Sequence, residues 1–281
     1  MNVEDAVAAV VGRKPRRLVP LAGGCVGEVY RVDFDGNKPL VAKVDHGNSG
    51  QLDIEGLMLE YLAQHLPVPA VIHTAPELLL MEYVVGNSTF SPVAERHAAE
   101  LLAALHEVTG DEFGFECDTL IGGLHQPNPW TDSWLAFFGE HRLVFMAEQA
   151  QAHGRLEPST VDRVRALAAN LEKYLAEPAA PSLLHGDVWS GNVLAVGPRI
   201  TAFLDPAVYF GDPEIELAFI SMFSTFGGPF FDTYRALRPF DEEFMSVRRH
   251  LYNLYPLLVH ARLFGGSYLQ SVEATLERFV Y

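Results

Sequence analysis

Cysteine is scarce in this sequence. The 281 residues include two cysteines, Cys25 and Cys117, too few for a disulfide framework. A reducing compartment is therefore expected. No apolar run reaches the length of a membrane span without a charge, and acidic residues precede the first apolar run, the reverse of a secretory signal. The sequence thus predicts a soluble cytoplasmic protein.

Basic residues are also few. Lys and Arg together number 20 against 36 Asp and Glu, which gives a formal net charge of −16. A general nucleic-acid binder needs a basic surface that replaces phosphate counterions, so that class is disfavoured. An anionic membrane surface would repel the chain, whereas a cationic small molecule would be drawn toward it. No nucleic-acid or membrane partner is expected.

The first third of the chain is predicted to be rich in strands. Alternation over residues 28–34, a turn at 35–37 and an apolar run over 39–44 predict a hairpin. Shorter strands are expected near residues 18–21 and 78–81. A helical pattern follows the hairpin over residues 52–66, and Pro67 and Pro69 are expected to end it.

The remainder of the chain is predicted to be mainly helical. One amphipathic helix is expected over residues 92–108, and a second begins near 158 with an apolar stripe that reaches Leu175. A loop and a hairpin interrupt this pattern between residues 183 and 205. The expected fold class is α+β, with a small β-rich lobe joined to a larger, mainly α-helical lobe.

Residues 185–192 read HGDVWSGN, which fits the pattern H-x-D-x-x-x-x-N, and Asp205 follows Asp187 by 18 residues. Phosphoryl transfer from ATP needs a carboxylate that accepts or orients the hydroxyl proton, and oxygen ligands that hold Mg²⁺ on the phosphates. We interpret Asp187 as the base and Asn192 and Asp205 as the metal ligands. Each residue alone also suits an ordinary turn or strand end, but the spaced set favours a kinase.

Lys43 ends a predicted strand, and Glu55 lies on the following helix, as the kinase signature requires. The alternative is a surface ion pair of little consequence. A glycine-rich turn precedes this strand and is expected to contact the nucleotide phosphates through Gly23, Gly24 and Cys25. This turn lacks the full G-x-G-x-x-G pattern of protein kinases.

The strand end at residues 81–84 stands where kinases place the hinge. Its nucleotide-binding candidates are Met81, Glu82 and Val84, with the C=O of Glu82 and the N–H of Val84 expected to hold the adenine edge. The alternative is a buried strand end without a ligand.

These residues, and three further stretches, resemble the fructosamine kinase (ketosamine-3-kinase) family, a branch of the aminoglycoside-phosphotransferase and protein-kinase-like fold. The stretches are LDPAVYFG at 204–211, QPNPW at 126–130 and LYNLY at 251–255. The resemblance implies a nucleotide-binding lobe over residues 1–85 and a catalytic and substrate-binding lobe over residues 86–281. It depends most on the HGDVWSGN segment with Trp189.

The resemblance implies ATP-dependent phosphorylation of the 3-hydroxyl of a ketosamine, free or protein-bound, with Mg²⁺ as cofactor. The product falls apart and frees the amine, which would make the activity deglycation. Asp187 would orient the sugar hydroxyl and Trp189 would stack on the sugar ring, the alternative for Trp189 being a core position. For Trp130 and Trp134, helix packing and substrate contact both stay open. His106 is expected to be structural and His185 to order the loop.

Two positions depart from the family pattern. Gly27 stands where Asn is expected in the glycine-rich loop, and Glu216 takes the usual place of Asp, where it is expected to affect support of the catalytic loop. The alternatives are another small-molecule kinase of this fold, acting on an aminoglycoside, choline or homoserine, or a nucleotide-binding pseudokinase.

Cys25 lies within the glycine-rich loop, whose amide groups favour a thiolate. We hypothesise that oxidation of Cys25 slows the enzyme, by modification or by a disulfide between two chains. The expected state is therefore a monomer or a redox-linked dimer.

Overall fold

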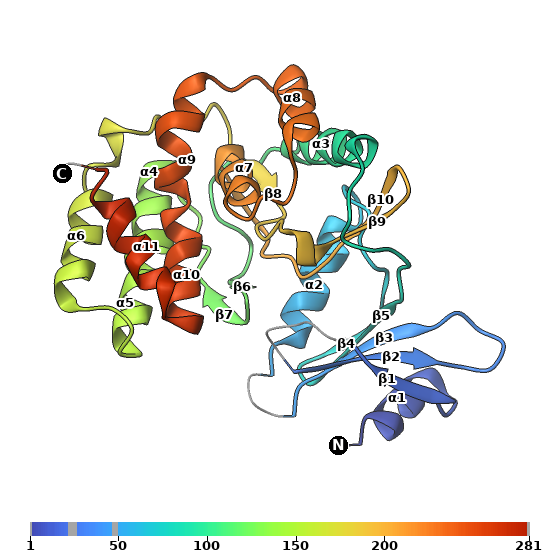
Figure 1. Ribbon diagram of the computed structural model, residues 1–281. Helices are drawn as coiled ribbons and strands as arrows, with labels where there is room; N and C mark the ends of the chain where they lie inside the picture. Colours follow the sequence, from blue (N-terminus) through green and yellow to red (C-terminus); the bar gives the residue numbers. More distant parts are fainter. Residues whose placement is uncertain (1, 22–26, 47–49, 280–281) are drawn as a thin grey trace.

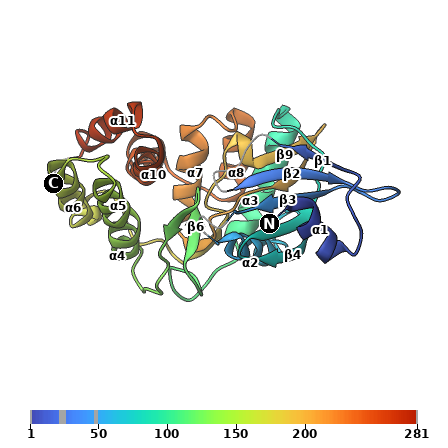
Figure 2. The ribbon, with the colours of Figure 1, turned by 90° about the horizontal axis from the view of Figure 1, so that it is seen from below.

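The computed structural model describes residues 2–21, 27–46 and 50–279. A β-sheet lies at one end of the molecule, α4, α5, α6, α10 and α11 lie at the other, and α7 lies between them (Figures 1 and 2). The α+β architecture expected from the sequence is confirmed. Within the described ranges, no helix is long and apolar enough to cross a membrane.

The sheet has five antiparallel strands in the order β1-β2-β3-β5-β4. Their bounds are β1 Arg17–Pro20, β2 Glu28–Asp33, β3 Leu40–Val44, β4 Val71–Ala75 and β5 Leu78–Glu82. The expected hairpin of β2 and β3 is confirmed. The edge strand β4 was not expected from the sequence.

Helices cover both faces of this sheet, and β3 has apolar residues on each face. Ala42 and Val44 join an apolar cluster with α1 (Val3–Val11), whereas Val41 joins a cluster with α2 (Leu52–Leu62). Because side chains alternate along a strand, Lys43 points to the same face as Val41, toward α2. The strand therefore aims a cationic side chain at the helix that carries Glu55.

The remaining helices make up most of the rest of the chain, and several of their lengths differ from expectation. Their bounds are α3 Pro92–His106, α4 Trp134–Phe137, α5 Phe145–Ala152, α6 Pro158–Ala168, α7 Pro213–Met222, α8 Gly228–Leu237, α9 Arg249–Tyr252, α10 Leu254–Phe264 and α11 Ser267–Leu276. The π-helical turns are η1 Phe138–Val144 and η4 Phe244–Arg248, and the 3₁₀ turns are η2 Leu171–Lys173 and η3 Ser190–Asn192. Helix α6 ends before Leu175, because the chain turns at Asn170 into η2.

Three short antiparallel pairs lie among these helices. They are β6 Thr119–Ile121 with β7 Leu124–Gln126, β8 Ser182–Leu184 with β11 Tyr209–Gly211, and the expected hairpin of β9 Val193–Val196 with β10 Arg199–Phe203. The pairs β8–β11 and β9–β10 bring both ends of the 185–205 segment together. This arrangement sets the position of the HGDVWSGN residues.

The large apolar cluster of the helical part extends into the sheet part, because it includes Met58 and Leu62 of α2. A backbone bridge between Asn87 and Ala195 adds a second connection, with N–O distances of 3.0 and 2.8 Å. The expected division at residue 85 stays a prediction.

Candidate active site

Lys43 forms a buried ion triad with two carboxylates. Its Nζ lies 2.6 Å from Oε1 of Glu55 and 2.6 Å from Oδ1 of Asp205, and its side chain is only 7% exposed. Burial by itself would lower the pKa of Lys43, but the charges of Asp205 and Glu55 outweigh it and raise that pKa. Lys43 is therefore a cation at neutral pH, close to a carboxylate 162 residues away in the chain.

The loop after β8 carries the HGD residues. Gly186 has a φ of +86°, and a Cβ there would lie 2.1 Å from the carbonyl oxygen of Ala207, so only glycine fits. His185 is buried, and its Nδ1 accepts the N–H of Asp187 at 3.2 Å. The expected role of His185 in ordering this loop agrees with that bond.

Asp187 and Asn192 are hydrogen-bonded to each other. The Asn192 amide donates to Oδ2 of Asp187 at 2.8 Å and to its carbonyl oxygen at 3.1 Å. The carbonyl oxygen of Asn192 accepts the N–H of Leu204 at 2.8 Å, which ties this turn to the residue before Asp205. Burial raises the pKa of Asp187 to about 8, the charge of Asp205 adds to this rise, and the Asn192 hydrogen bond opposes it.

Asp205 has a φ of +51°, a left-handed conformation that costs energy for a residue other than glycine. Its carboxylate reaches Lys43 from this position and is one-third exposed. The strained backbone thus aims an accessible carboxylate at the space between β3 and the Asp187 loop.

A buried hydrogen-bonded chain supports the Asp187 loop. Oε1 of Glu216 accepts the N–H of Gly186 at 2.6 Å, and Oε2 lies 2.9 Å from Nε2 of His106. Nδ1 of His106 lies 2.7 Å from the hydroxyl of Tyr234. Burial alone would raise the pKa of Glu216, but its hydrogen bond to His106 is the main reason that this pKa is lowered instead. The expected structural role of His106 agrees with these contacts.

The nucleotide-binding residues expected from the sequence are only partly described. Gly23, Gly24 and Cys25 lie outside the described residues. The redox hypothesis for Cys25 therefore concerns a residue outside the described ranges and stays a prediction. Gly27 has a φ of +68°, and a Cβ there would lie 2.3 Å from the carbonyl oxygen of Val44, so the close approach to β3 requires glycine.

The expected hinge lies at the end of β5, the neighbour of β3 in the sheet. Met81 is buried against β3 and pairs with Val41. The N–H of Val84, beyond the last residue of β5, makes no backbone hydrogen bond to the described residues. An adenine edge could therefore bond to this amide without displacing a protein partner.

A cavity of about 370 Å³ opens beside Asp187, between α7 and α10. Gly186, Asp187 and Glu216 form its polar side, and Trp189 forms part of its rim. The rest of the lining is mainly aromatic and aliphatic. An apolar cavity with a few polar groups is a common arrangement for a small-molecule site.

Trp189 belongs to this cavity and not to the core. Its side chain is 39% exposed, and its ring lies so close to Gly191 that a Cβ there would be 2.4 Å from two ring atoms. The ring centroid of Phe223 lies 6.1 Å away. The core position considered for Trp189 is therefore wrong, because its side chain lines the cavity and is partly exposed.

The two other tryptophans lie outside this cavity. Trp134 is fully buried, stacks on Phe138 and donates from Nε1 to the hydroxyl of Tyr252 at 3.0 Å, so packing explains it. Trp130 is 46% exposed, and its ring lies 6.3 Å from that of Phe210.

The QPNPW stretch accepts hydrogen bonds from a buried arginine elsewhere in the chain. Arg142 is fully buried and donates to the carbonyl oxygen of Pro127 at 2.7 Å and to Oδ1 of Asn128 at 2.6 Å. Gln126 accepts the hydroxyl of Tyr255, which lines the cavity, at 2.7 Å. Gln126 therefore positions Tyr255 in the cavity wall from behind.

Sequence reasoning missed most of the aromatic wall of the cavity. The missed side chains are Phe219, Phe223, His260 and Tyr268. The spacing of four between Phe219 and Phe223, and of eight between His260 and Tyr268, was visible in the sequence. The same spacing marks the buried face of any helix, so it does not distinguish a cavity wall from a core.

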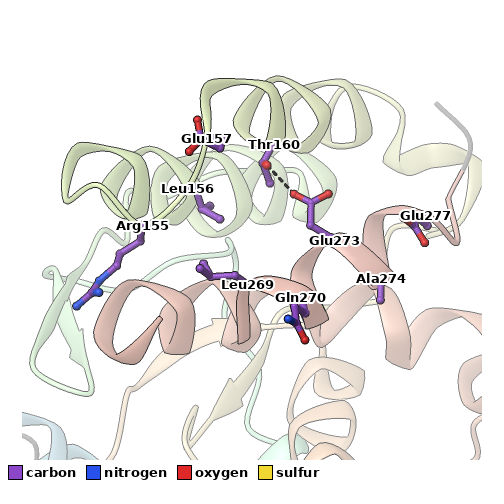
Figure 3. A pocket seen from close by; sticks show the side chains of 9 residues that line it. All are labelled: Arg155, Leu156, Glu157, Thr160, Leu269, Gln270, Glu273, Ala274 and Glu277. Atoms are coloured by element: carbon purple, nitrogen blue, oxygen red, sulfur yellow. Dashed lines mark hydrogen bonds between the residues drawn. The ribbon is translucent and has the colours of Figure 1, made fainter. Parts of the chain in front are cut away.

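A second groove, of about 400 Å³, lies between α11 and the start of α6 and shares no lining residue with the first (Figure 3). Its most buried contact is the hydrogen bond from the hydroxyl of Thr160 to Oε1 of Glu273, at 2.6 Å. The other oxygen of Glu273 accepts from Arg163. These bonds join α6 to α11, which assigns the groove to helix packing.

The donor set near Lys43 fits Mg²⁺ and ATP phosphates. Asp205 offers a carboxylate and Asn192 an amide oxygen, and Mg²⁺ is commonly held by one or two such groups together with substrate phosphates. Among the described residues, no group of three or more Asp, Glu, His or Cys could hold a metal ion alone. The site thus suits a cation that arrives with its phosphates.

A sequence profile described as fructosamine kinase matches residues 2–281. The chain belongs to the fructosamine kinase family. A "Probable ketoamine kinase" from Synechocystis is 34% identical over 274 residues, which covers 92% of this chain and 88% of the relative. A Vibrio parahaemolyticus protein of the same description is 30% identical, with 93% and 92% covered.

Solved structures agree with this membership. A Thermobifida fusca protein assigned to fructosamine-3-kinase superposes with a TM-score of 0.87 at 29% identity, over 98% of this chain and 97% of that chain. The aminoglycoside phosphotransferase APH(4)-Ia, in a ternary complex with ADP and hygromycin B, superposes with a TM-score of 0.69 at 19% identity, over the whole of both chains. The expected protein-kinase-like fold is thereby confirmed.

Proposed function

We propose that this protein transfers a phosphoryl group from ATP to the 3-hydroxyl of a ketosamine, and that the product releases its amine. The observation that carries the proposal is the placement of Asp187. Its carboxylate lines the cavity on one side and bonds to Asn192 on the other, and Asn192 is tied through Leu204 to Asp205. A hydroxyl in the cavity and phosphates near Lys43 would thus meet at Asp187.

Each residue of the site has a role in this proposal. Asp187 orients the hydroxyl and, in its ionised form, accepts its proton, Lys43 stabilises negative charge on the phosphates, and Glu55 holds the ammonium group of Lys43. Asn192 and Asp205 would hold Mg²⁺. When bound, Mg²⁺ neutralises charge that develops on the transferred group.

Nucleotide and metal must displace one existing contact. Lys43 bonds to Glu55 and to Asp205 at the same distance of 2.6 Å. Asp205 is the more exposed of the two carboxylates, so we expect it to turn toward the cation while Glu55 keeps the ammonium in place.

The cavity disfavours one rival substrate class and favours another. An aminoglycoside carries several ammonium groups, but the carboxylates of the lining are Asp187 and Glu216, and both oxygens of Glu216 are already bonded. The aromatic wall suits a quaternary ammonium such as choline, because ring faces attract cations. Choline is therefore the second candidate, and the family membership favours a ketosamine over it.

A substrate panel tests the proposal. ATP consumption is measured with a ribulosamine, a fructosamine, choline and kanamycin, and NMR of the product locates the phosphate. We expect turnover of a ketosamine that depends on Mg²⁺ and forms the 3-phosphate. Turnover of choline or kanamycin without turnover of either ketosamine would overturn the assignment, and no turnover of any would support a pseudokinase.

A further inference from the structure

Part of the cavity beside Asp187 is lined by a continuous cluster of aromatic rings. His260 of α10 lies at its centre, with centroid distances of 5.2 Å to Phe223, 4.9 Å to Tyr268 and 5.7 Å to Phe264. Phe223 in turn approaches the ring of Trp189. We call Phe223, His260, Phe264 and Tyr268 the ring cluster.

The ring cluster presents no formal charge. Nδ1 of His260 lies 2.7 Å from the carbonyl oxygen of Pro256, which can only accept, so Nδ1 carries a proton. Burial lowers the pKa of His260, which keeps its ring neutral at physiological pH. Besides His260, the titratable groups that line the cavity are Tyr255 on the same helix, and Asp187, Glu216, Tyr209 and Tyr268 on other elements. The cavity thus combines two carboxylates with an uncharged ring cluster.

Two rings of this cavity are exposed to an unusual degree. Phe264 is 58% exposed and Trp189 is 39% exposed, and both stand on the cavity rim. Exposed aromatic side chains gathered at one opening are typical of a binding site. The exposure also means that Phe264 contributes little to the core.

The geometry points to an occupant for the ring cluster. If the 3-hydroxyl of a ketosamine meets Asp187, the amine nitrogen lies four bonds from that hydroxyl oxygen, through C3, C2 and C1. The substituent on that nitrogen must then begin inside the same cavity. Because the ring cluster lines that cavity, we expect the substituent to reach it.

We propose that the ring cluster binds the nitrogen substituent of the ketosamine, and that the preferred substrates are ketosamines of small aromatic or branched apolar amines. This inference rests on the proposed function and names the substrate class within it. The secondary ammonium lies against ring faces, where cation–π attraction replaces an ion pair. An apolar substituent gains from burial, whereas a second, primary ammonium is hydrated more strongly than a quaternary one and would lose that hydration without a carboxylate in the ring cluster to pair with.

Three ribulosamines test the inference, with methyl, 2-phenylethyl and 4-aminobutyl substituents on the nitrogen. We expect kcat/KM for the phenylethyl compound to exceed that of the methyl compound by about 10-fold to 100-fold, a range typical of apolar pockets. The aminobutyl substituent is similar in length to phenylethyl but ends in a charged group, so this compound should have the lowest kcat/KM of the three. Phe223→Ala and Phe264→Ala should each lower the phenylethyl-to-methyl ratio at least about 3-fold.

Trp130→Ala is the matched control, because Trp130 is a comparably exposed ring outside the cavity. It should leave the ratio unchanged, and circular dichroism checks that all variants are folded. Equal kcat/KM for the three compounds would overturn the inference and leave the proposed function intact. Faster turnover of a ribulosylated protein than of the phenylethyl compound would also overturn it. No turnover of any ketosamine would instead overturn the proposed function.

Discussion

Replacing Glu216 with glutamine tests the hydrogen-bonded chain beneath the Asp187 loop. The carboxylate of Glu216 can only accept, so Nε2 of His106 carries a proton and Nδ1 can accept from Tyr234. In Glu216→Gln, the amide oxygen can still accept the N–H of Gly186, but the NH₂ group then faces His106. We expect the His106 proton to move to Nδ1, which then donates to the oxygen of Tyr234.

The expected loss of stability in Glu216→Gln follows from the kind of hydrogen bond that is weakened. Hydrogen bonds to a charged group contribute about 1.5–3 kcal/mol and neutral ones about 0.5–1.5 kcal/mol, so the two bonds of Glu216 weaken by about 1 kcal/mol each. Removal of a buried charge offsets part of this loss. Glu216→Gln should therefore lower the free energy of unfolding by only about 1–2 kcal/mol.

Tyr234→Phe removes the acceptor on which this rearrangement depends. In the double variant, the Nδ1–H of His106 has no partner in a fully buried site, which costs about 1–3 kcal/mol more. Urea unfolding of wild type, the two single variants and the double variant should show a coupling energy between the two substitutions of about 1 kcal/mol or more. Tyr252→Phe is the control. The buried hydroxyl of Tyr252 bonds to Asp212, which does not belong to the hydrogen-bonded chain of Glu216, His106 and Tyr234. The effects of Tyr252→Phe and Glu216→Gln on stability should therefore be additive.

Additive effects of Glu216→Gln and Tyr234→Phe, within about 0.5 kcal/mol, would refute the reasoning. Steady-state kinetics supply a second readout, because Gly186 adjoins Asp187. We expect kcat to fall further in the double variant than in either single variant, with little change in KM for ATP.

Three further predictions follow from the site and its surroundings. Asp187→Asn should lower kcat about 100-fold or more and leave ATP binding nearly unchanged, because it removes the base and not a phosphate contact; near-normal turnover would contradict the role of Asp187. Gly191→Ala should displace the ring of Trp189, because the new Cβ at position 191 would lie 2.4 Å from ring atoms. This variant should raise KM for the sugar more than KM for ATP, and equal effects on the two KM values would argue against stacking of Trp189 on the sugar. Burial raises the pKa of Asp212 from 3.8 to about 6, so the folded state binds this proton more tightly and stability falls as pH rises between these values, by about 3 kcal/mol. Asp212→Asn should gain stability relative to wild type from about pH 4 to pH 7, measured by urea unfolding, and a constant difference would contradict the shift.

The pairing of Lys43 with Glu55 could be predicted because local patterns specify both residues. The alternation of β3 puts Lys43 on one face of the sheet, and the helical pattern that includes Glu55 begins at residue 52. Their ion pair at 2.6 Å is the expected contact. Whether these residues act on phosphates stays a prediction.

Other elements were missed for physical reasons. The edge strand β4 includes the exposed Ile72, so it lacks the clear alternation of a half-buried strand. The apolar stripe that suggested a longer α6 continues to Leu175 through a separate 3₁₀ turn, because residues in successive turns can bury the same face without forming one helix.

The sequence by itself determined the chemical groups, because spacing along the chain and the period of each element are local properties. It determined that Asp187 and Asn192 share one turn, that Gly186 precedes them and that Lys43 ends a strand. Only the tertiary structure decided which distant groups meet. It brought Asp205 to Lys43, placed Glu216 under Gly186, and separated the exposed ring of Trp189 from the buried ring of Trp134, because contacts between distant segments depend on how whole helices and strands pack.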